Sequence, residues 1–250
     1  MKTKRHPFRT LCLVAGVFLP LVSSQGASLY TYGHGDIRVG AVGGQLSLQY
    51  YIGAPESDYA IVGGEFVFGE SFAASDIWVN VPVQLTTTLP GEFPLLAGSA
   101  GESVWVIPTN DPYPIVAPFL GFSTEGFDGS LWGGFQFTLG EVRSPSGSGE
   151  FAVWTGLDGG GINPLLSTVE GVSQDSFTLT GNGHVHHFMG FTEAGLWEVD
   201  FTVASTYLPD GTLGSATETY YFHVVPEPTS FCLAAAGLAA VLLRRSRCRA

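Results

Sequence analysis

The sequence predicts an all-β protein, an Ig-like antiparallel β-sandwich flanked by an N-terminal leader and a C-terminal hydrophobic tail. Short apolar runs rich in Val, Phe, Tyr, Trp and Thr recur along the chain, and most alternate with a period of two residues. Clusters of Gly, Pro, Asn and Asp separate these runs. No stretch has the periodicity of an amphipathic helix, so we expect strands and turns throughout the central part.

Residues 1–27 have the three parts of a secretory signal peptide. "MKTKRHPFRT" is basic, "LCLVAGVFLPLV" is apolar, and "SSQGAS" is small and polar. Cleavage after Gly26 or Ala27 would leave a small residue at the cut. Cys12 has no lipobox around it, which argues against a lipoprotein anchor. We therefore expect an exported protein whose leader is removed.

Residues 28–224 are expected to form the sandwich domain. Beyond the first segment, the strand-like runs are "GQLSLQYYI", "GEFVFG", "DIWVNVPVQLTTTL", "ESVWVIP", "SLWGGFQFTLGEV", "EFAVWTGL", "DSFTLTG", "GLWEVDFTVAST" and "ETYYFHVV". The stretch "RSPSGSGE", residues 143–150, is interpreted as a hairpin loop. Two packed β sub-domains are the alternative to one sandwich.

The charge of this domain is strongly negative. Residues 28–228 carry 22 acidic residues against two basic ones, Arg38 and Arg143, for a net charge of −20. Nucleic acid and anionic lipid are excluded as partners, because binding to phosphate requires Lys and Arg. Such a surface attracts cations, although solubility alone is the alternative reason for the charge.

All cysteines lie in the two end segments, at Cys12, Cys232 and Cys248. The domain between them therefore has no disulfide, no thiolate metal site and no cysteine nucleophile.

Histidines gather in the stretch "GHVHHF". His184 and His186 are two residues apart, so on a strand both side chains point to one face, and His187 points to the other. His34 and Asp36, in "YGHGDI", have the same spacing. Three imidazoles and a carboxylate suit Zn²⁺, so we predict a zinc site formed by these two pairs. The alternative is that the histidines are merely solvated. A further histidine, in "YYFHV", is expected to pack rather than to bind metal.

The last 26 residues resemble a bacterial sorting signal. Pro226, Glu227 and Pro228 precede an apolar run, residues 231–243, and an arginine-rich tip. At about 1.5 Å per residue this run spans only about 20 Å, which is short for a bilayer core of roughly 30 Å. Residues 225–250 are similar to the PEP-CTERM sorting signal. That resemblance implies a transient membrane anchor, an exosortase-type processing enzyme as partner, and a place at the cell surface or in the extracellular matrix.

A second resemblance covers most of the domain. "YTYGHGDIRVGAVGGQLSLQ" and "GHVHHFMGFTEAGLWEVDFTVASTYLPDGT" look like parts of the choice-of-anchor M domain. With the PEP-CTERM tail, the combination resembles a subgroup described as Zur-regulated, which implies expression under zinc limitation. The family's histidine motifs fall on His34, Asp36, His184 and His186. The sequence departs from the pattern at Met189, where an aromatic residue is usual.

These patterns favour a binding protein over an enzyme. The chain has no Gly-x-Ser-x-Gly elbow and no HExxH helix, and nothing singles out a carboxylate pair for glycoside hydrolysis. We expect a surface or matrix protein that binds a divalent metal ion, zinc, as a capture or accessory component. The alternative is a structural or adhesive protein of a biofilm matrix with extracellular polysaccharide as its partner. The five tryptophans are open to either role, as a sugar platform or as core.

Overall fold

The structure is a computed structural model that describes residues 26–42, 45–55, 58–158 and 161–227. Nearly all of the predicted leader lies outside these residues, as do Pro228 and the apolar tail. Within the described ranges there is no helix with the length and apolarity needed to span a membrane.

The described residues form strands joined by turns and three short 3-10 helices. The strands are β1 (Ser28–Val42), β2 (Gln45–Ile52), β3 (Ala60–Val62), β4 (Glu65–Val67), β5 (Glu70–Phe72), β6 (Ile77–Val81), β7 (Thr86–Thr88), β8 (Ser103–Ile107), β9 (Pro118–Ser123), β10 (Phe135–Arg143), β11 (Phe151–Gly156), β12 (Ile162–Ser167), β13 (Ser176–Leu179), β14 (His184–His186), β15 (Phe188–Phe191), β16 (Gly195–Tyr207) and β17 (Thr212–Val224). The 3-10 helices are η1 (Ala74–Asp76), η2 (Val83–Leu85) and η3 (Pro94–Leu96).

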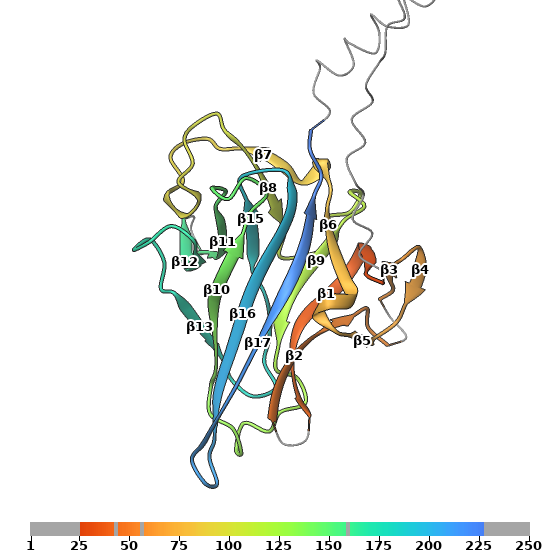
Figure 1. Ribbon diagram of the computed structural model, residues 1–250, viewed down its shortest axis with the longest axis vertical. Coiled ribbons are helices and arrows are strands. Elements are labelled where there is room, and N and C mark those ends of the chain that lie inside the picture. The colour runs from red at the N-terminus through yellow and green to blue at the C-terminus, as the bar shows by residue number, and fades with distance from the viewer. Residues whose placement is uncertain (1–25, 43–44, 56–57, 159–160, 228–250) are drawn as a thin grey trace, which may run out of the picture.

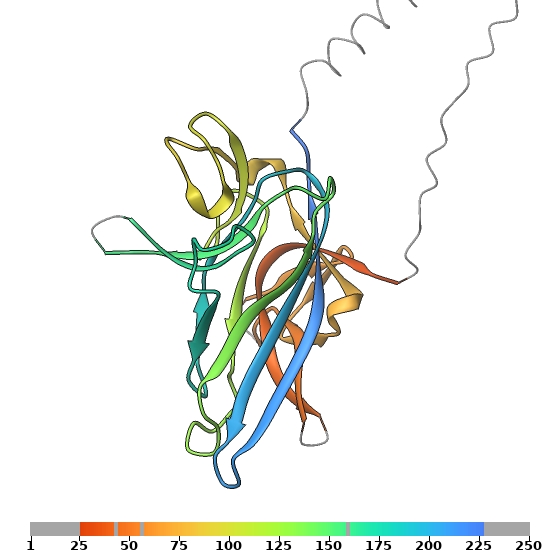
Figure 2. The ribbon, with the colours of Figure 1, turned by 60° about the vertical axis from the view of Figure 1, so that its left-hand side comes forward.

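Twelve of these strands form one hydrogen-bonded sheet in which β1 joins two halves. One half has the order β13-β10-β16-β17-β6-β1, and the other contains β5, β2, β1, β9 and β14. The halves pack face to face as the layers of a sandwich (Figures 1 and 2). The rings of Tyr50 and Tyr220 meet across the layers with centroids 4.8 Å apart, and those of Phe122 and Phe201 at 5.4 Å.

A smaller, five-stranded sheet continues the second layer. Its order is β12-β11-β15-β8-β7, and β15 follows β14 after a single residue, His187. Phe191 of this sheet contacts Phe222 of the first layer, with ring centroids 5.1 Å apart. The chain therefore passes from one sheet to the other within the histidine-rich segment, and the same layer holds both.

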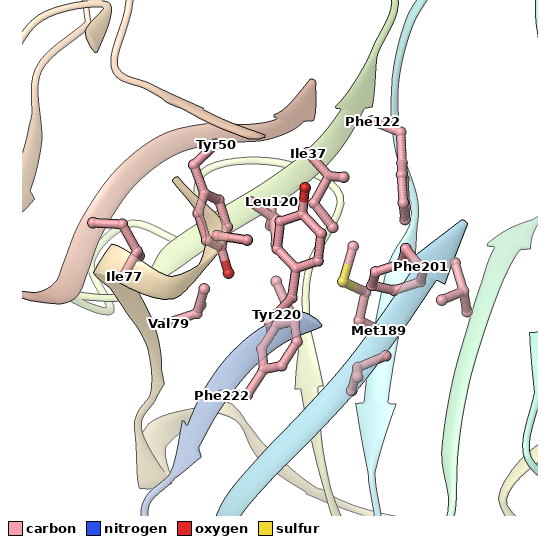
Figure 3. Close-up of a cluster of buried hydrophobic side chains, with 14 of the residues drawn as sticks. Ile37, Tyr50, Ile77, Val79, Leu120, Phe122, Met189, Phe201, Tyr220 and Phe222 are labelled. Atoms are coloured by element: carbon pink, nitrogen blue, oxygen red, sulfur yellow. The ribbon is translucent and has the colours of Figure 1, made fainter. Parts of the chain in front are cut away.

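The core between the layers consists of alternating strand residues. Figure 3 shows the side chains that meet there, namely Ile37, Tyr50, Ile77, Val79, Leu120, Phe122, Met189, Phe201, Tyr220 and Phe222. All of these are fully buried. Each fully buried Phe, Leu or Ile side chain contributes about 1.5–3 kcal/mol to folding, so this apolar layer is the main stabilising element.

The all-β sandwich expected from the sequence is confirmed, and the structure adds two details. Three strand pairs are parallel, β1 with β6, β1 with β9, and β17 with β6. The loop at residues 143–150 does not close a hairpin, because β10 pairs with β13 and β16 whereas β11 pairs with β12 and β15. That loop instead carries the chain from one layer to the other, so our interpretation of it was wrong.

Candidate metal centre

Three neighbouring strands of the second layer form the floor of the candidate site. β9 lies in the middle, with β1 parallel on one side and β14 antiparallel on the other. His34 and Asp36 are on β1, and His184 and His186 are on β14. The two predicted pairs therefore lie on the same sheet, separated by one strand rather than directly adjacent.

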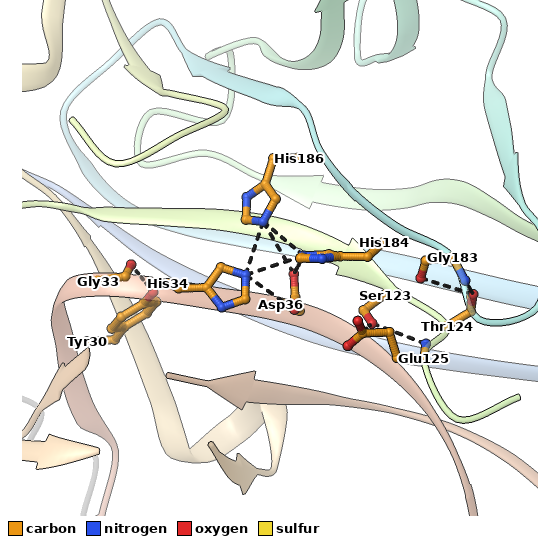
Figure 4. Close-up of polar contacts among 10 residues, drawn as sticks. All are labelled: Tyr30, Gly33, His34, Asp36, Ser123, Thr124, Glu125, Gly183, His184 and His186. Carbon is orange, nitrogen blue, oxygen red and sulfur yellow. Dashed lines mark hydrogen bonds and ion pairs between the residues drawn. The ribbon is translucent and has the colours of Figure 1, made fainter. Parts of the chain in front are cut away.

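The register of β9 brings the two pairs to one place. Asp36 and His186 are both paired with Gly121, from opposite sides. His184 is paired with Ser123, one step further along the same face. Figure 4 shows the four side chains of the two pairs pointing toward a common centre above β9.

The three imidazoles present the same atom, Nε2, to this centre. The Nε2 atoms of His34 and His184 are 3.3 Å apart, those of His34 and His186 are 3.1 Å apart, and those of His184 and His186 are 3.0 Å apart. Asp36 places Oδ1 3.1 Å from Nε2 of His184, and Oδ2 3.6 Å from Nε2 of His34. One ligand atom from each of the four residues lies within 4.8 Å of all the others.

These separations fit a small metal ion. A tetrahedral Zn²⁺ ion with bonds of 2.0–2.1 Å holds its ligand atoms about 3.3 Å apart. Three mutually close Nε2 atoms cannot all be satisfied by hydrogen bonds to one another, because each neutral imidazole nitrogen either donates or accepts once. A cation at the centre satisfies all three lone pairs together. Imidazole nitrogen excludes Ca²⁺ and Mg²⁺ as preferred ions, since both favour oxygen ligands.

Gly121 makes this convergence sterically possible. A Cβ atom at position 121 would lie 2.5 Å from Oδ1 of Asp36 and 2.9 Å from Nε2 of His186. Any side chain there would occupy the space between the ligands. The signal in the sequence is an isolated glycine inside an apolar run, "PFLGFS", which is typical of a close approach in a strand. This run was not among the predicted strands, so both β9 and Gly121 were missed.

The glycines on either side of His34 are closely packed. A Cβ at Gly35 would meet the hydroxyl of Tyr30, at 2.8 Å, and one at Gly33 would meet the carbonyl oxygen of Tyr59, at 2.6 Å. Gly33 also has a φ of +96°, in the region that favours glycine. Both glycines therefore let β1 bend from one layer into the other.

Burial and charge set the protonation of the site. The Asp36 side chain is only 1% exposed, and a carboxylate buried to this degree requires cationic or hydrogen-bonding partners. Its hydrogen bond to His184 raises the pKa of that imidazole. Burial, together with the neighbouring imidazoles, lowers the pKa of His186 to about 4 despite the nearby carboxylate. His186 is therefore neutral at physiological pH, which is the form that binds metal.

Two further histidines of the domain, His187 and His223, lie apart from the centre. His187 points to the opposite face from His186, as expected, and is buried against Phe122 and Phe177. His223, in "YYFHV", is partly exposed on β17 and is not part of the four-residue group.

Three of the tryptophans, Trp105, Trp154 and Trp197, are buried, so they belong to the core and do not form a sugar platform.

An open cleft of about 550 Å³ leads to the centre. Its walls include the four candidate ligands together with Arg38, Tyr51, Asp58, Phe119 and Glu125. Phe119 packs against both His34 and His186, with ring centroids 5.4 and 5.3 Å away. The ring of Phe119 thus supports two imidazoles from one side, while the cleft gives ions access from solvent.

The end of the folded domain carries the sorting determinant. The backbone N–H of Val225 donates to the carbonyl oxygen of Val81, and Nε1 of Trp105 donates to the carbonyl oxygen of Val225, both at 2.9 Å. Residues 224–247 match the PEP-CTERM protein-sorting motif. The chain carries a PEP-CTERM sorting motif. It is therefore an exported protein sorted to the cell surface, and the motif implies processing by an exosortase. No curated protein and no solved structure matches the chain.

Proposed function

We propose that this PEP-CTERM protein captures a divalent metal ion, zinc above all, at the cell surface. The observation that carries the proposal is the convergence of His34, Asp36, His184 and His186 over the one strand position, Gly121, that leaves room for an ion. The residue types favour zinc, because imidazole with one carboxylate in a tetrahedral arrangement is a common zinc shell.

Capture, rather than catalysis, is the role we infer for the ion. Catalytic zinc sites keep one position open for water, with three protein ligands, whereas here four protein groups surround the centre. The His184 side chain is 35% exposed, so the site is accessible to ions in solution. Residues 28–228 carry a net charge of −20, which raises the local concentration of cations.

The resemblance to choice-of-anchor M proteins of the Zur-regulated subgroup agrees with this role. Expression under zinc limitation is what a capture protein at the surface would require. On this proposal, residues 28–224 are the metal-binding domain, and the sorting tail determines where the captured ion is presented. An accessory protein that hands the ion to an importer is the form of capture that we favour.

Calorimetric titration of zinc into the metal-stripped exported protein tests the proposal. We expect one zinc ion per chain, with binding lost in His184→Ala/His186→Ala and in His34→Ala. His223→Ala is the matched control, because it also removes a strand histidine but leaves the centre intact. Equal zinc affinity in wild type and the double variant would overturn the proposal. Loss in the double variant alone would restrict the site to β14.

A second function, adhesion in the matrix, is favoured by one surface feature. Tyr59, Phe66 and Phe68 are 42%, 64% and 52% exposed, and their rings touch one another around Tyr59. Clustered exposed aromatic rings are typical of binding surfaces, and extracellular polysaccharide is the partner we propose for this patch. Loss of retention on a polysaccharide column in Phe66→Ser/Phe68→Ser, with zinc binding unchanged, would separate this function from metal capture.

A further inference from the structure

Among the residues that the structure describes, Arg38 differs from the other arginine of the domain in having no acidic partner. Arg143 forms ion pairs of 2.6–3.0 Å with Glu141, Glu198 and Asp200. Among the described residues, no carboxylate forms an ion pair with Arg38, although residues 28–228 carry a net charge of −20. Arg38, which has no carboxylate partner within the described part of the chain, lines the cleft of the metal centre.

The Arg38 guanidinium is held in place by two contacts. Its Cζ atom lies 4.5 Å from the centroid of the Tyr51 ring, and its Nη2 donates to the carbonyl oxygen of Glu125 at 3.0 Å. Tyr51 lies on β2 directly opposite Asp36 in the sheet. The contact of Arg38 with the Tyr51 ring therefore places the guanidinium on the side of Asp36. A guanidinium has five N–H donors in a rigid fork, and one donor is used here.

We propose that the cleft binds a small dicarboxylate together with the metal ion, with one carboxylate on Arg38 and the other attracted by the charge of the ion from outside its four protein ligands. This inference rests on the proposed metal capture. The Cα atoms of Asp36 and Arg38, two residues apart on the same face of β1, are separated by about 7 Å. Both side chains line the same cleft, so one small ligand can reach both. Planar, bidentate binding of a carboxylate is what a fixed guanidinium does best.

The charges of the cleft make the two ligands interdependent. Without an ion, the described residues of the cleft walls carry three carboxylates, Asp36, Asp58 and Glu125, against the single positive charge of Arg38. The net charge of −2 repels an anion. A divalent cation brings this sum to zero and places a positive charge beside Arg38. The dicarboxylate should therefore bind to the metal-loaded protein. By linkage, the metal should raise the affinity for the dicarboxylate by the same factor by which the dicarboxylate raises the affinity for the metal.

The two arginines allow a direct test, because the exported domain gives only two guanidinium Nε–H signals in a ¹⁵N NMR spectrum. Malonate is titrated into the exported protein with and without one equivalent of zinc. We expect the Arg38 signal to shift only in the zinc-loaded protein, and the Arg143 signal to stay in place. Arg38→Gln should lower the malonate affinity measured by calorimetry by about tenfold or more, whereas acetate, with one carboxylate, should bind more weakly than malonate.

Each other result counts against the inference. An unmoved Arg38 signal in the zinc-loaded protein overturns the dicarboxylate site and leaves zinc capture intact. Equal shifts with and without zinc, or equal shifts of both arginines, overturn the joint site as well. Failure of the proposed function is seen separately, as an absence of zinc binding in the calorimetric titration without malonate. In Arg38→Gln, an Arg143 signal at its wild-type position confirms that the variant is folded.

Discussion

Asp36 and His186 face each other across a glycine: both are paired with Gly121 of β9, Asp36 in parallel register and His186 in antiparallel register. They are 150 positions apart in the sequence, and Oδ1 of Asp36 lies 3.8 Å from Nε2 of His186. A strand between two ligand-bearing strands normally fills this space with its own side chain. The site therefore depends on a residue that contributes no ligand atom.

Gly121→Ala is accordingly expected to abolish or greatly weaken metal binding without removing a ligand. The added methyl group would lie 2.5 Å from Oδ1 of Asp36, so the carboxylate or the strand must move. We expect the zinc affinity to fall at least tenfold, the size of effect seen when the support of a ligand is disturbed. Calorimetry measures the loss, and Gly156→Ala is the control, because a Cβ there meets nothing within 4 Å. Wild-type affinity in Gly121→Ala would contradict the geometry of the site.

Zinc affinity should fall as the pH falls, and it should begin to do so above pH 6.5. Asp36 raises the pKa of His184 above its ordinary value, so the metal-free site holds a proton there that zinc must displace. Below this pKa the apparent affinity should drop about tenfold or more per pH unit. His186, with a pKa of about 4, adds no second proton in this range. Competition with a chromophoric chelator between about pH 8 and pH 6 measures the slope.

Asp36→Asn provides the control for that pH dependence. Loss of the carboxylate removes both a ligand and the cause of the raised pKa of His184. The variant should bind zinc more weakly at every pH, yet its affinity should change less between about pH 8 and pH 6. A variant with the wild-type slope would show that another group supplies the proton.

The sequence predicts the ligand pairs of the site well, but it does not predict the strand that lies between them. The spacing of His184 and His186, and of His34 and Asp36, predicts a common face from strand alternation alone. The strand that joins the pairs does not follow from such local patterns, because "PFLGFS" is nearly all apolar and lacks an alternation of polar and apolar residues. Its neighbours are set by sheet topology, through contacts between residues far apart in the chain. The sandwich was predictable from local periodicity, whereas the two parallel pairings of β1 were not.

Export should remove both ends of the chain. The motif at residues 224–247 begins where β17 ends, so the folded domain leaves Pro226 and Glu227 just beyond the sheet. Intact-mass measurement of the exported protein should show the loss of the leader up to about Gly26 or Ala27 and of the apolar tail. Replacing Pro226, Glu227 and Pro228 by alanine should prevent the C-terminal cleavage. Recovery of an exported wild-type chain that still carries residues 231–243 would contradict processing at this motif.

Acid should destabilise the protein through His187, a histidine that is not part of the metal centre. Its side chain is 7% exposed, it lies against Phe122 and Phe177, and its Nδ1 has no hydrogen-bond partner among the described residues. Burial lowers its pKa to about 4, whereas the unfolded chain has a histidine pKa of about 6.5. Between these values the unfolded state binds more protons, so the free energy of unfolding decreases as the pH falls from about 6.5 toward 4.

The size of this effect can be isolated with a single substitution. His187→Leu keeps an apolar side chain in the core and removes the titrating group. From pH 7 to pH 5 the wild type should lose about 2 kcal/mol more unfolding free energy than His187→Leu, as measured by urea unfolding in the presence of a chelator. His223→Gln removes a partly exposed histidine instead and should retain the wild-type dependence. Equal losses in wild type and His187→Leu would mean that His187 is protonated in the folded protein as readily as in the unfolded chain.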